Sequence, residues 1–320
     1  MEASDEAKLA YTRVAPEFVD DQGLWEAGAN REQLFDRRDG SVYRMHPKVR
    51  LAVDIALATG RPLLLRGEPG SGKSSLAPYL ARNLRARYYE EVVVASTRVE
   101  DFLWRFDTVR KLSDAQARLP GEPARDDADY IVEGVLWKAF DPDGNFGSDQ
   151  KPDAVVLIDE IDKADPDVPN GLLVPLGAGQ FRVPTRTSPI LIPEGRHVVV
   201  VITTNEERQL PPAFLRRCIV AAIPSPTKTS LTAIARLHVA GPDGEVEPAL
   251  NQLFDALADK LLELRDPEIN PTIKGDRPPG VAEYLDAVRA CMRLKVDPSS
   301  SSPAWSLVEE FTLRKPTQTS

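Results

Sequence analysis

The sequence predicts an α/β protein: a five-stranded parallel β-sheet covered on both faces by helices, followed by a C-terminal helical lid. Short apolar runs alternate with segments of helical periodicity between about residues 42 and 223. Strands that are buried on both faces form such continuous apolar runs, which is typical of parallel sheets. Beyond residue 225 only helical segments follow, which predicts that the lid is a separate part.

Five apolar runs are predicted as the strands, namely Arg61–Arg66, Glu91–Ala95, Ala154–Ile158, His197–Ile202 and Ile219–Ile223. Helices are predicted over His46–Ala58, Ser74–Ala86, Asn170–Leu176, Thr227–Val239, Glu247–Leu264 and Val281–Leu294. Gly60 is expected to end the first helix, whereas Pro78 and Pro175 are unusual inside theirs. The crossovers between parallel strands are expected to be right-handed.

The expected organisation is an N-terminal extension over residues 1–40, a core over 41–225, the lid over 226–314 and a tail over 315–320. Within the core, an insertion at about 98–153 is too long for a simple connection. A second insertion, at about 181–193, is predicted to form a small hairpin.

Composition limits the classes of function. Of the 320 residues, 42% are hydrophobic and 28% are charged, which is ordinary for a globular protein. A net charge of −9 gives no general footprint for nucleic acid or an anionic membrane, although a local basic channel is compatible with this average. Without a signal pattern or a run long enough to span a bilayer, we expect a cytoplasmic protein. Cys218 and Cys291 are expected to be reduced thiols, and no zinc-ligand spacing is present.

A glycine-rich motif, Gly67–Ser74, follows a predicted strand and opens a predicted helix, and it matches G-x-x-x-x-G-K-[ST]. Glycines let the backbone turn its N–H groups around an anion, and the helix N-terminus adds partial positive charge. Lys73 is expected to reach the β- and γ-phosphates, and the Ser74 hydroxyl to ligate Mg²⁺. The predicted nucleotide contacts are Gly67, Glu68, Pro69, Gly70, Ser71, Gly72, Lys73, Ser74 and Ser75. A plain glycine-rich turn with a solvated lysine is disfavoured by the complete motif in this context.

Two acidic residues, Asp159 and Glu160, end a predicted buried strand. The carboxyl ends of parallel strands are where ligands bind in such sheets. Asp159 is expected to hold Mg²⁺, and Glu160 to polarise the attacking water. Without the glycine-rich motif, an acidic pair that starts a helix would be an equal reading. Asn205 follows a neighbouring strand and is expected to orient that water, although an Asn after a strand is usually a turn residue.

These motifs, together with Leu210–Arg217 (LPPAFLRR), resemble the MoxR-type AAA+ ATPases over about Val42–Ile223. The resemblance implies an αβα sandwich with a helical lid, ATP and Mg²⁺ as ligands, and a ring of copies, most often six. It implies that Arg98–Phe140 includes an insertion in the second helix and that the hairpin at Phe181–Pro193 precedes the strand before Asn205. It also makes Asn205 the residue termed sensor 1.

The resemblance assigns an arginine finger to the pair Arg216 and Arg217, with Arg217 as the better match and Arg216 where the family has Asp. A finger from a neighbouring copy contributes ~10³–10⁵ in rate; the alternative is a surface arginine pair. The family's sensor-2 arginine is missing, since the aligned helix start is Gly280-Val281. Arg277 or Lys274 either substitutes for it or is an exposed loop residue.

The segment Asp101–Phe106 is aromatic-rich and lies in the expected insertion. Phe102 and Trp104 either grip a polypeptide or pack in a core or interface.

The leading functional hypothesis is ATP-driven remodelling or activation of a protein client. The family's usual partner, a protein with a von Willebrand factor A domain, is expected by resemblance. The alternatives are a nucleotide-gated assembly scaffold with little turnover, against which Glu160 argues, and a P-loop small-molecule kinase. A GTPase is disfavoured because no N/T-K-x-D motif is present.

Overall fold

The structure is a computed structural model that describes residues 40–119, 122–141, 143–145, 153–241, 244–266, 269, 278–296, 298 and 302–314. The chain divides into two compact units. The helical unit contains the described residues of Met1–Arg44, Glu68–Gly72 and Pro224–Ser320. The sheet unit contains Met45–Gly67 and Lys73–Ile223. Apart from Gly40, the expected extension over residues 1–40 lies outside the described residues, as does the tail over 315–320.

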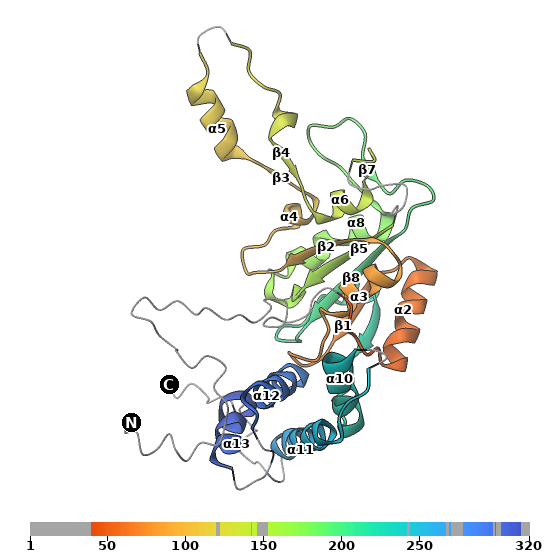
Figure 1. Ribbon diagram of the computed structural model, residues 1–320. Coiled ribbons are helices and arrows are strands. Elements are labelled where there is room, and N and C mark those ends of the chain that lie inside the picture. The colour runs from red at the N-terminus through yellow and green to blue at the C-terminus, as the bar shows by residue number, and fades with distance from the viewer. Residues whose placement is uncertain are drawn as a thin grey trace. The chain divides into compact units, whose positions relative to one another are not determined.

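The sheet unit is built on a five-stranded parallel sheet in the order β2-β5-β8-β1-β9. Its strands are β1 Leu63–Arg66, β2 Arg87–Val92, β5 Ala154–Asp159, β8 Val198–Thr204 and β9 Ile219–Ala222 (Figure 1). Every residue of β5 is buried, in agreement with a continuous apolar run. The predicted fold class is thus confirmed.

The strand predicted at Glu91–Ala95 is wrong in position. The observed strand β2 covers Arg87–Val92 and pairs with β5 in register from Arg87 opposite Ala154 to Val92 opposite Asp159. Because β2 is the edge strand, most of its residues are only half-buried and need no continuous apolar run. The fully buried Val93 lies beyond the end of the strand.

Helices flank the sheet. The helix α2 (Pro47–Thr59) packs on β1 and β9, whereas α3 (Leu76–Asn83) and α6 (Val135–Phe140) pack on β2 and β5. Helix α2 ends at Gly60 in the left-handed conformation, as predicted. Helix α3 begins two residues later than predicted, after a turn over 73–75. Pro78 lies in its first turn, where the missing N–H removes no helical hydrogen bond.

The long insertion contains α4 (Val99–Leu103), β3 (Trp104–Phe106), α5 (Thr108–Ala117), a 3₁₀ turn (Asp127–Tyr130) and β4 (Ile131–Glu133). Strands β3 and β4 form an antiparallel ribbon, and α5 has no buried residue and stands away from the sheet (Figure 1). Phe102 is fully buried in the core, so it packs in the interior, whereas Trp104 is half-buried against that core.

Between β5 and β8 the chain forms a 3₁₀ turn (Ile161–Lys163), α7 (Asp167–Gly171), α8 (Leu173–Ala178) and a two-stranded hairpin of β6 (Gln180–Phe181) and β7 (Ile190–Leu191). The single short helix predicted here is therefore two helices, with Pro175 in the first turn of α8. A last short helix, α9 (Pro212–Leu215), precedes β9.

The helical unit has its own apolar core. Its helices are α10 (Lys228–Ala240), α11 (Pro248–Arg265), α12 (Val281–Leu294), α13 (Pro303–Val308) and a π-helical turn over Glu309–Leu313. The first three match the predicted helices. Helix α13 and its π turn were not predicted, but Trp305 and Leu313 are buried in this core. None of the helices in the described part of the chain is both long and apolar enough to cross a bilayer.

Candidate functional site

The glycine-rich loop follows β1 and leads into the turn before α3. Gly70 and Gly72 have φ angles of 75° and 86°, a region that side chains with a Cβ rarely adopt. Lys73, only 5% exposed, donates a hydrogen bond of 2.7 Å from its Nζ to the Gly67 carbonyl oxygen. Among the described residues, the buried Ser71 Oγ finds no hydrogen-bond partner. A buried hydroxyl of this kind is available to a ligand that enters the loop.

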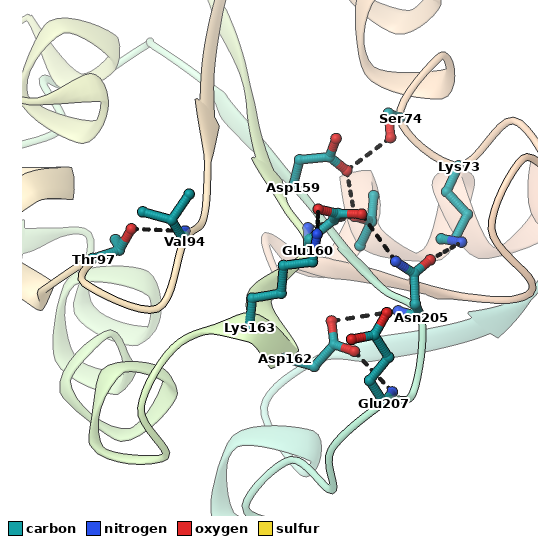
Figure 2. A network of polar contacts seen from close by, with 11 residues as sticks. Lys73, Ser74, Val94, Thr97, Asp159, Glu160, Asp162, Lys163, Asn205 and Glu207 are labelled. Atoms are coloured by element: carbon teal, nitrogen blue, oxygen red, sulfur yellow. Dashed lines mark hydrogen bonds and ion pairs between the residues drawn. The ribbon is translucent and has the colours of Figure 1, made fainter. Parts of the chain in front are cut away.

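One side-chain amide joins this loop to the end of β5. The Asn205 Oδ1 accepts a hydrogen bond of 2.7 Å from Lys73 Nζ, and its Nδ2 donates one of 3.0 Å to Glu160 Oε1 (Figure 2). Asn205 follows β8 directly, and β8 lies between β1 and β5 in the sheet. The order of the strands therefore places this amide between the lysine and the carboxylate.

Asp159 lies at the centre of a second set of contacts. Its Oδ1 accepts a hydrogen bond of 2.7 Å from Ser74 Oγ (Figure 2). The same oxygen accepts one of 2.5 Å from Thr203 Oγ. A carboxylate beside a hydroxyl is a pair of hard oxygen donors, the type that Mg²⁺ prefers, with water and phosphate oxygens completing its shell. Ser74 and Asp159 thus fit this ion. In the described residues there is no cluster of three or more His, Cys, Asp or Glu side chains for a metal.

The carboxylate of Glu160 is held at both of its oxygens. Oε1 accepts from Asn205, and Oε2 lies 2.5 Å from Lys163 Nζ. The backbone of Glu160 is left-handed, with φ 62° and ψ 47°, and its N–H donates to Thr203 Oγ at 2.9 Å. Hydrogen bonding to Glu160 raises the pKa of Lys163 above its usual value. Backbone conformations of this kind are costly and occur preferentially at functional sites.

A buried carboxylate anchors the loop that carries Asn205. Asp162, 2% exposed, accepts hydrogen bonds from the backbone N–H of Asn205 at 3.4 Å and of Glu207 at 2.9 Å (Figure 2). Both acceptor oxygens of Asp162 are therefore used to fix the loop after β8.

The fold brings together five of the predicted site residues, namely Lys73, Ser74, Asp159, Glu160 and Asn205. It also adds three to which the motif analysis assigned no role: Thr203, Asp162 and Lys163. Their polar side chains at the ends of β5 and β8 were the available signal, but a sequence does not show which backbone groups they reach.

Arg216 and Arg217 lie just before β9, at the amino-terminal end of the parallel strands. Strand β9 is parallel to β1, with Ile219 beside Leu63 and Ala222 beside Arg66. Arg217 therefore precedes the strands at the end opposite to the glycine-rich loop. At about 3.3 Å per residue, the separation from that loop is roughly 15–20 Å. Both arginines are exposed.

A pocket of about 250 Å³ lies beside Arg217, which lines it together with Arg61 and Cys218. The guanidinium of Arg61 donates a hydrogen bond of 3.4 Å to the Arg216 carbonyl oxygen. This contact ties the start of β1 to the turn that carries the two arginines.

Part of the glycine-rich loop belongs to the helical unit. Glu68–Gly72 is counted with this unit, and Ser71 N–H donates to the Glu68 carbonyl at 3.3 Å. Lys274 and Arg277 lie outside the described residues. Within the helical unit, Arg265 Nη2 contacts both carboxylate oxygens of Glu68, at 2.9 and 2.7 Å, a pair that the motif analysis did not anticipate.

The other members of the predicted loop are less closely involved in these contacts. Pro69 and Gly70 adjoin the start of α12, where the Ala282 N–H donates to the Gly70 carbonyl oxygen at 3.2 Å. Ser75 is the N-cap residue of α3, and its side chain makes no capping hydrogen bond.

Part of the chain is similar to a known protein family. Residues 62–218 match the AAA domain (dynein-related subfamily). The five-stranded parallel sheet with its flanking helices is thus an α/β fold of the AAA+ type. Chaperone protein ClpB 2 of Parasynechococcus marenigrum (strain WH8102) is 34% identical over 142 residues, which cover 44% of this chain and 13% of that protein.

Two solved structures align over most of the chain. A RuvB mutant of Thermotoga maritima aligns with a TM-score of 0.44 and 16% identity, over 82% of this chain and 67% of its own. NtrX from Brucella abortus in complex with ADP aligns with a TM-score of 0.46 and 13% identity, over 87% of this chain and 58% of its own.

Proposed function

We propose that this protein binds ATP with Mg²⁺ and hydrolyses it as a MoxR-type AAA+ ATPase, and that hydrolysis drives the remodelling or activation of a protein client. The observation that carries the proposal is the continuous set of bonds from Lys73 through Asn205 to Glu160, beside Ser74 and Asp159. A cation for phosphate, a carboxylate for water and a pair of hard oxygens for a metal meet at one edge of the sheet.

The binding role belongs to the glycine-rich loop and Lys73. Positive φ angles at Gly70 and Gly72 allow the backbone to follow the surface of a phosphate chain closely. The ammonium of Lys73 is already desolvated, and two of its acceptors are the neutral oxygens of Gly67 and Asn205. Phosphate oxygens are charged and form stronger hydrogen bonds than neutral acceptors do, so this exchange is favourable. Ser74 and Asp159 would hold the Mg²⁺ ion, which neutralises developing charge on the phosphates when it is bound.

The hydrolytic role belongs to Glu160 and Asn205. A general base must lie within hydrogen-bond reach of the water that it activates. Each Glu160 oxygen accepts one hydrogen bond from the described residues and keeps a further lone pair for water. Asn205 bridges Lys73 and Glu160, so it lies where phosphate and water would meet.

The arrangement of the two arginines supports action between copies. Because Arg217 lies at the opposite end of the strands from Lys73, its side chain is too short to reach the site of its own chain. An arginine finger placed in this way serves the site of a neighbouring copy. We therefore propose a ring, six copies being the family's usual number, with Arg217 as the finger and Arg216 as the less favoured candidate.

The partner side of the proposal rests on resemblance alone. A protein with a von Willebrand factor A domain is the proposed partner, and the client is a protein whose identity is open. The exposed helix α5 and the β3–β4 ribbon offer surface for such contacts.

The decisive experiment is steady-state ATP hydrolysis by the wild type and by Glu160→Gln. The substitution keeps the size of the side chain and removes its basicity, so we expect ATP affinity within about twofold and a turnover at least ~10²-fold lower. Equally negligible turnover in both proteins, with ATP and partner supplied, would favour the scaffold hypothesis. Phosphate transfer to a small molecule with a specific activity independent of protein concentration would favour the kinase.

A further inference from the structure

The carboxylate of Glu160 is held by two side chains from different parts of the fold. Asn205, at the end of β8, donates to Oε1 at 3.0 Å, and Lys163 lies on Oε2 at 2.5 Å. Figure 2 shows Lys163 reaching the carboxylate from the 3₁₀ turn that follows β5. The motif that predicts the site assigns no role to this lysine.

The local geometry explains why Lys163 reaches Glu160. The Lys163 N–H donates to the Glu160 carbonyl oxygen at 3.0 Å, which closes the 3₁₀ turn. In such a turn, side chains three residues apart lie almost directly above one another. Glu160 is held at the start of the turn by its left-handed backbone and its bond to Thr203 Oγ. The lysine and the carboxylate therefore meet because of the turn, before any long-range contact is made.

We propose that Lys163 is a positioning residue that fixes the carboxylate of Glu160 where it accepts a proton from the water that attacks the γ-phosphate, an inference that rests on the proposed ATPase function. Two bonds from opposite sides leave the carboxylate no free rotation about its last side-chain torsion. With Lys163 removed, Asn205 is the one described side chain that still holds the Glu160 carboxylate, and the oxygen of Asn205 is bonded to Lys73. The carboxylate is then attracted toward the Lys73 ammonium and away from the position that a base requires.

The ion pair contributes little to stability, which makes the role testable. The side chains of Lys163 and Glu160 are 41% and 28% exposed. Pairs with this exposure are screened by solvent and typically stabilise a fold by less than about 1 kcal/mol. An effect on turnover without an effect on unfolding is thus the signature of positioning rather than of a structural role.

The test compares Lys163→Met, Lys163→Arg and the wild type in full-length protein, by kcat, KM for ATP and the urea midpoint. Lys228→Met is the control, because Lys228 is 45% exposed, close to the 41% of Lys163, and forms a 2.6 Å ion pair with Asp259. We expect Lys163→Met to lower kcat about tenfold, part of the ~10²–10⁴ that a general base supplies. KM and the urea midpoint stay at wild-type values, Lys163→Arg recovers most of kcat, and Lys228→Met resembles the wild type.

Three results would overturn the positioning role: an unchanged kcat in Lys163→Met, a kcat that Lys163→Arg does not recover, or a loss of kcat that follows a lower urea midpoint. Glu160→Gln separates this outcome from failure of the proposed function. If Glu160→Gln turns over ATP as fast as the wild type, the ATPase assignment of Glu160 is wrong. If Glu160→Gln is inactive and Lys163→Met is fully active, only the role of Lys163 is wrong.

Discussion

Lys73 and Asn205 are joined by a hydrogen bond of 2.7 Å from the ammonium to the side-chain oxygen. The bond links the residue after the glycine-rich loop to the residue after β8, which are 132 positions apart in the chain. Because the same amide also donates to Glu160, the proposed phosphate-binding group and the proposed base belong to one network. Changes at one end of the network are therefore expected to reach the other.

Lys73→Ala should strongly weaken ATP binding. The ammonium is the buried cation of the loop, and a hydrogen bond between charged groups contributes about 1.5–3 kcal/mol. We expect the affinity for ATP to fall ~10-fold if the bond contributes ~1.5 kcal/mol and about 100-fold if it contributes ~3 kcal/mol, as measured by titration calorimetry. Lys48→Ala, on the exposed side of α2, is the control and should bind ATP normally. Unchanged affinity in Lys73→Ala would contradict the assignment of the loop.

Arg217→Ala should bind ATP nearly as the wild type does and hydrolyse it far more slowly. The guanidinium lies at the other end of the strands from its own site, so its loss removes only a contribution to a neighbouring copy. A loss of ~10³–10⁵ in kcat is the range for a missing arginine finger. Arg182→Ala, an exposed arginine of the hairpin segment, is the control.

Mixing variants tests whether the arginine acts between copies. Arg217→Ala subunits keep their own base, and Glu160→Gln subunits keep their arginine. A mixed assembly therefore contains some complete sites, and activity should exceed that of either variant alone. No recovery at any mixing ratio would count against action in trans. Repeating the mixture with Arg216→Ala decides which of the two neighbouring arginines is the finger.

Asp162→Ala should weaken both the fold and the site. The carboxylate is buried and accepts from the N–H groups of Asn205 and Glu207, which would be left without these acceptors. The expected loss is about 1–3 kcal/mol in the free energy of unfolding, measured in urea. Asp165→Ala is the control, because Asp165 is exposed and accepts one backbone N–H at 3.0 Å. Equal stability of the two variants would show that the buried carboxylate of Asp162 does not stabilise the fold.

Burial of the two thiols is expected to lower the free energy of unfolding at alkaline pH. Burial raises the pKa of Cys218 and of Cys291 from 9.0 to about 12. The folded chain then holds these protons more tightly than the unfolded chain does. The free energy of unfolding is therefore unaffected below pH 9 and falls as the pH rises from 9 toward 12, by about 1.4 kcal/mol per pH unit and thiol.

Cys218→Ala and Cys291→Ala isolate this effect, since other groups also titrate in the same range. In urea unfolding at pH 8 and pH 10.5, each variant should lose less stability than the wild type over the interval. Alkylation of the folded wild type at pH 8 should be slow for both buried thiols. Identical pH dependence in all three proteins would contradict the raised pKa values of the two buried thiols.

Several parts of the fold are determined by local patterns in the sequence. The glycine-rich motif, the apolar run that ends in Asp159 and Glu160, and the helices of the C-terminal segment were each predicted close to their observed bounds. Such features follow from backbone freedom, side-chain periodicity and burial on both faces, which act over a few neighbouring residues.

Other features were decided only by the tertiary structure. The bounds of β2 depend on its register with β5, and α13 is stabilised by burial of Trp305 in a core assembled from distant helices. The contact between Lys163 and Glu160 could have been predicted from their spacing of three residues. The positioning role proposed for Lys163 depends also on Asn205, which holds the other carboxylate oxygen and comes from a distant strand. The sequence alone therefore specified which chemical groups are present and on which elements they lie. Their partners were set by strand order, because contacts between residues far apart in the chain depend on which strands become neighbours.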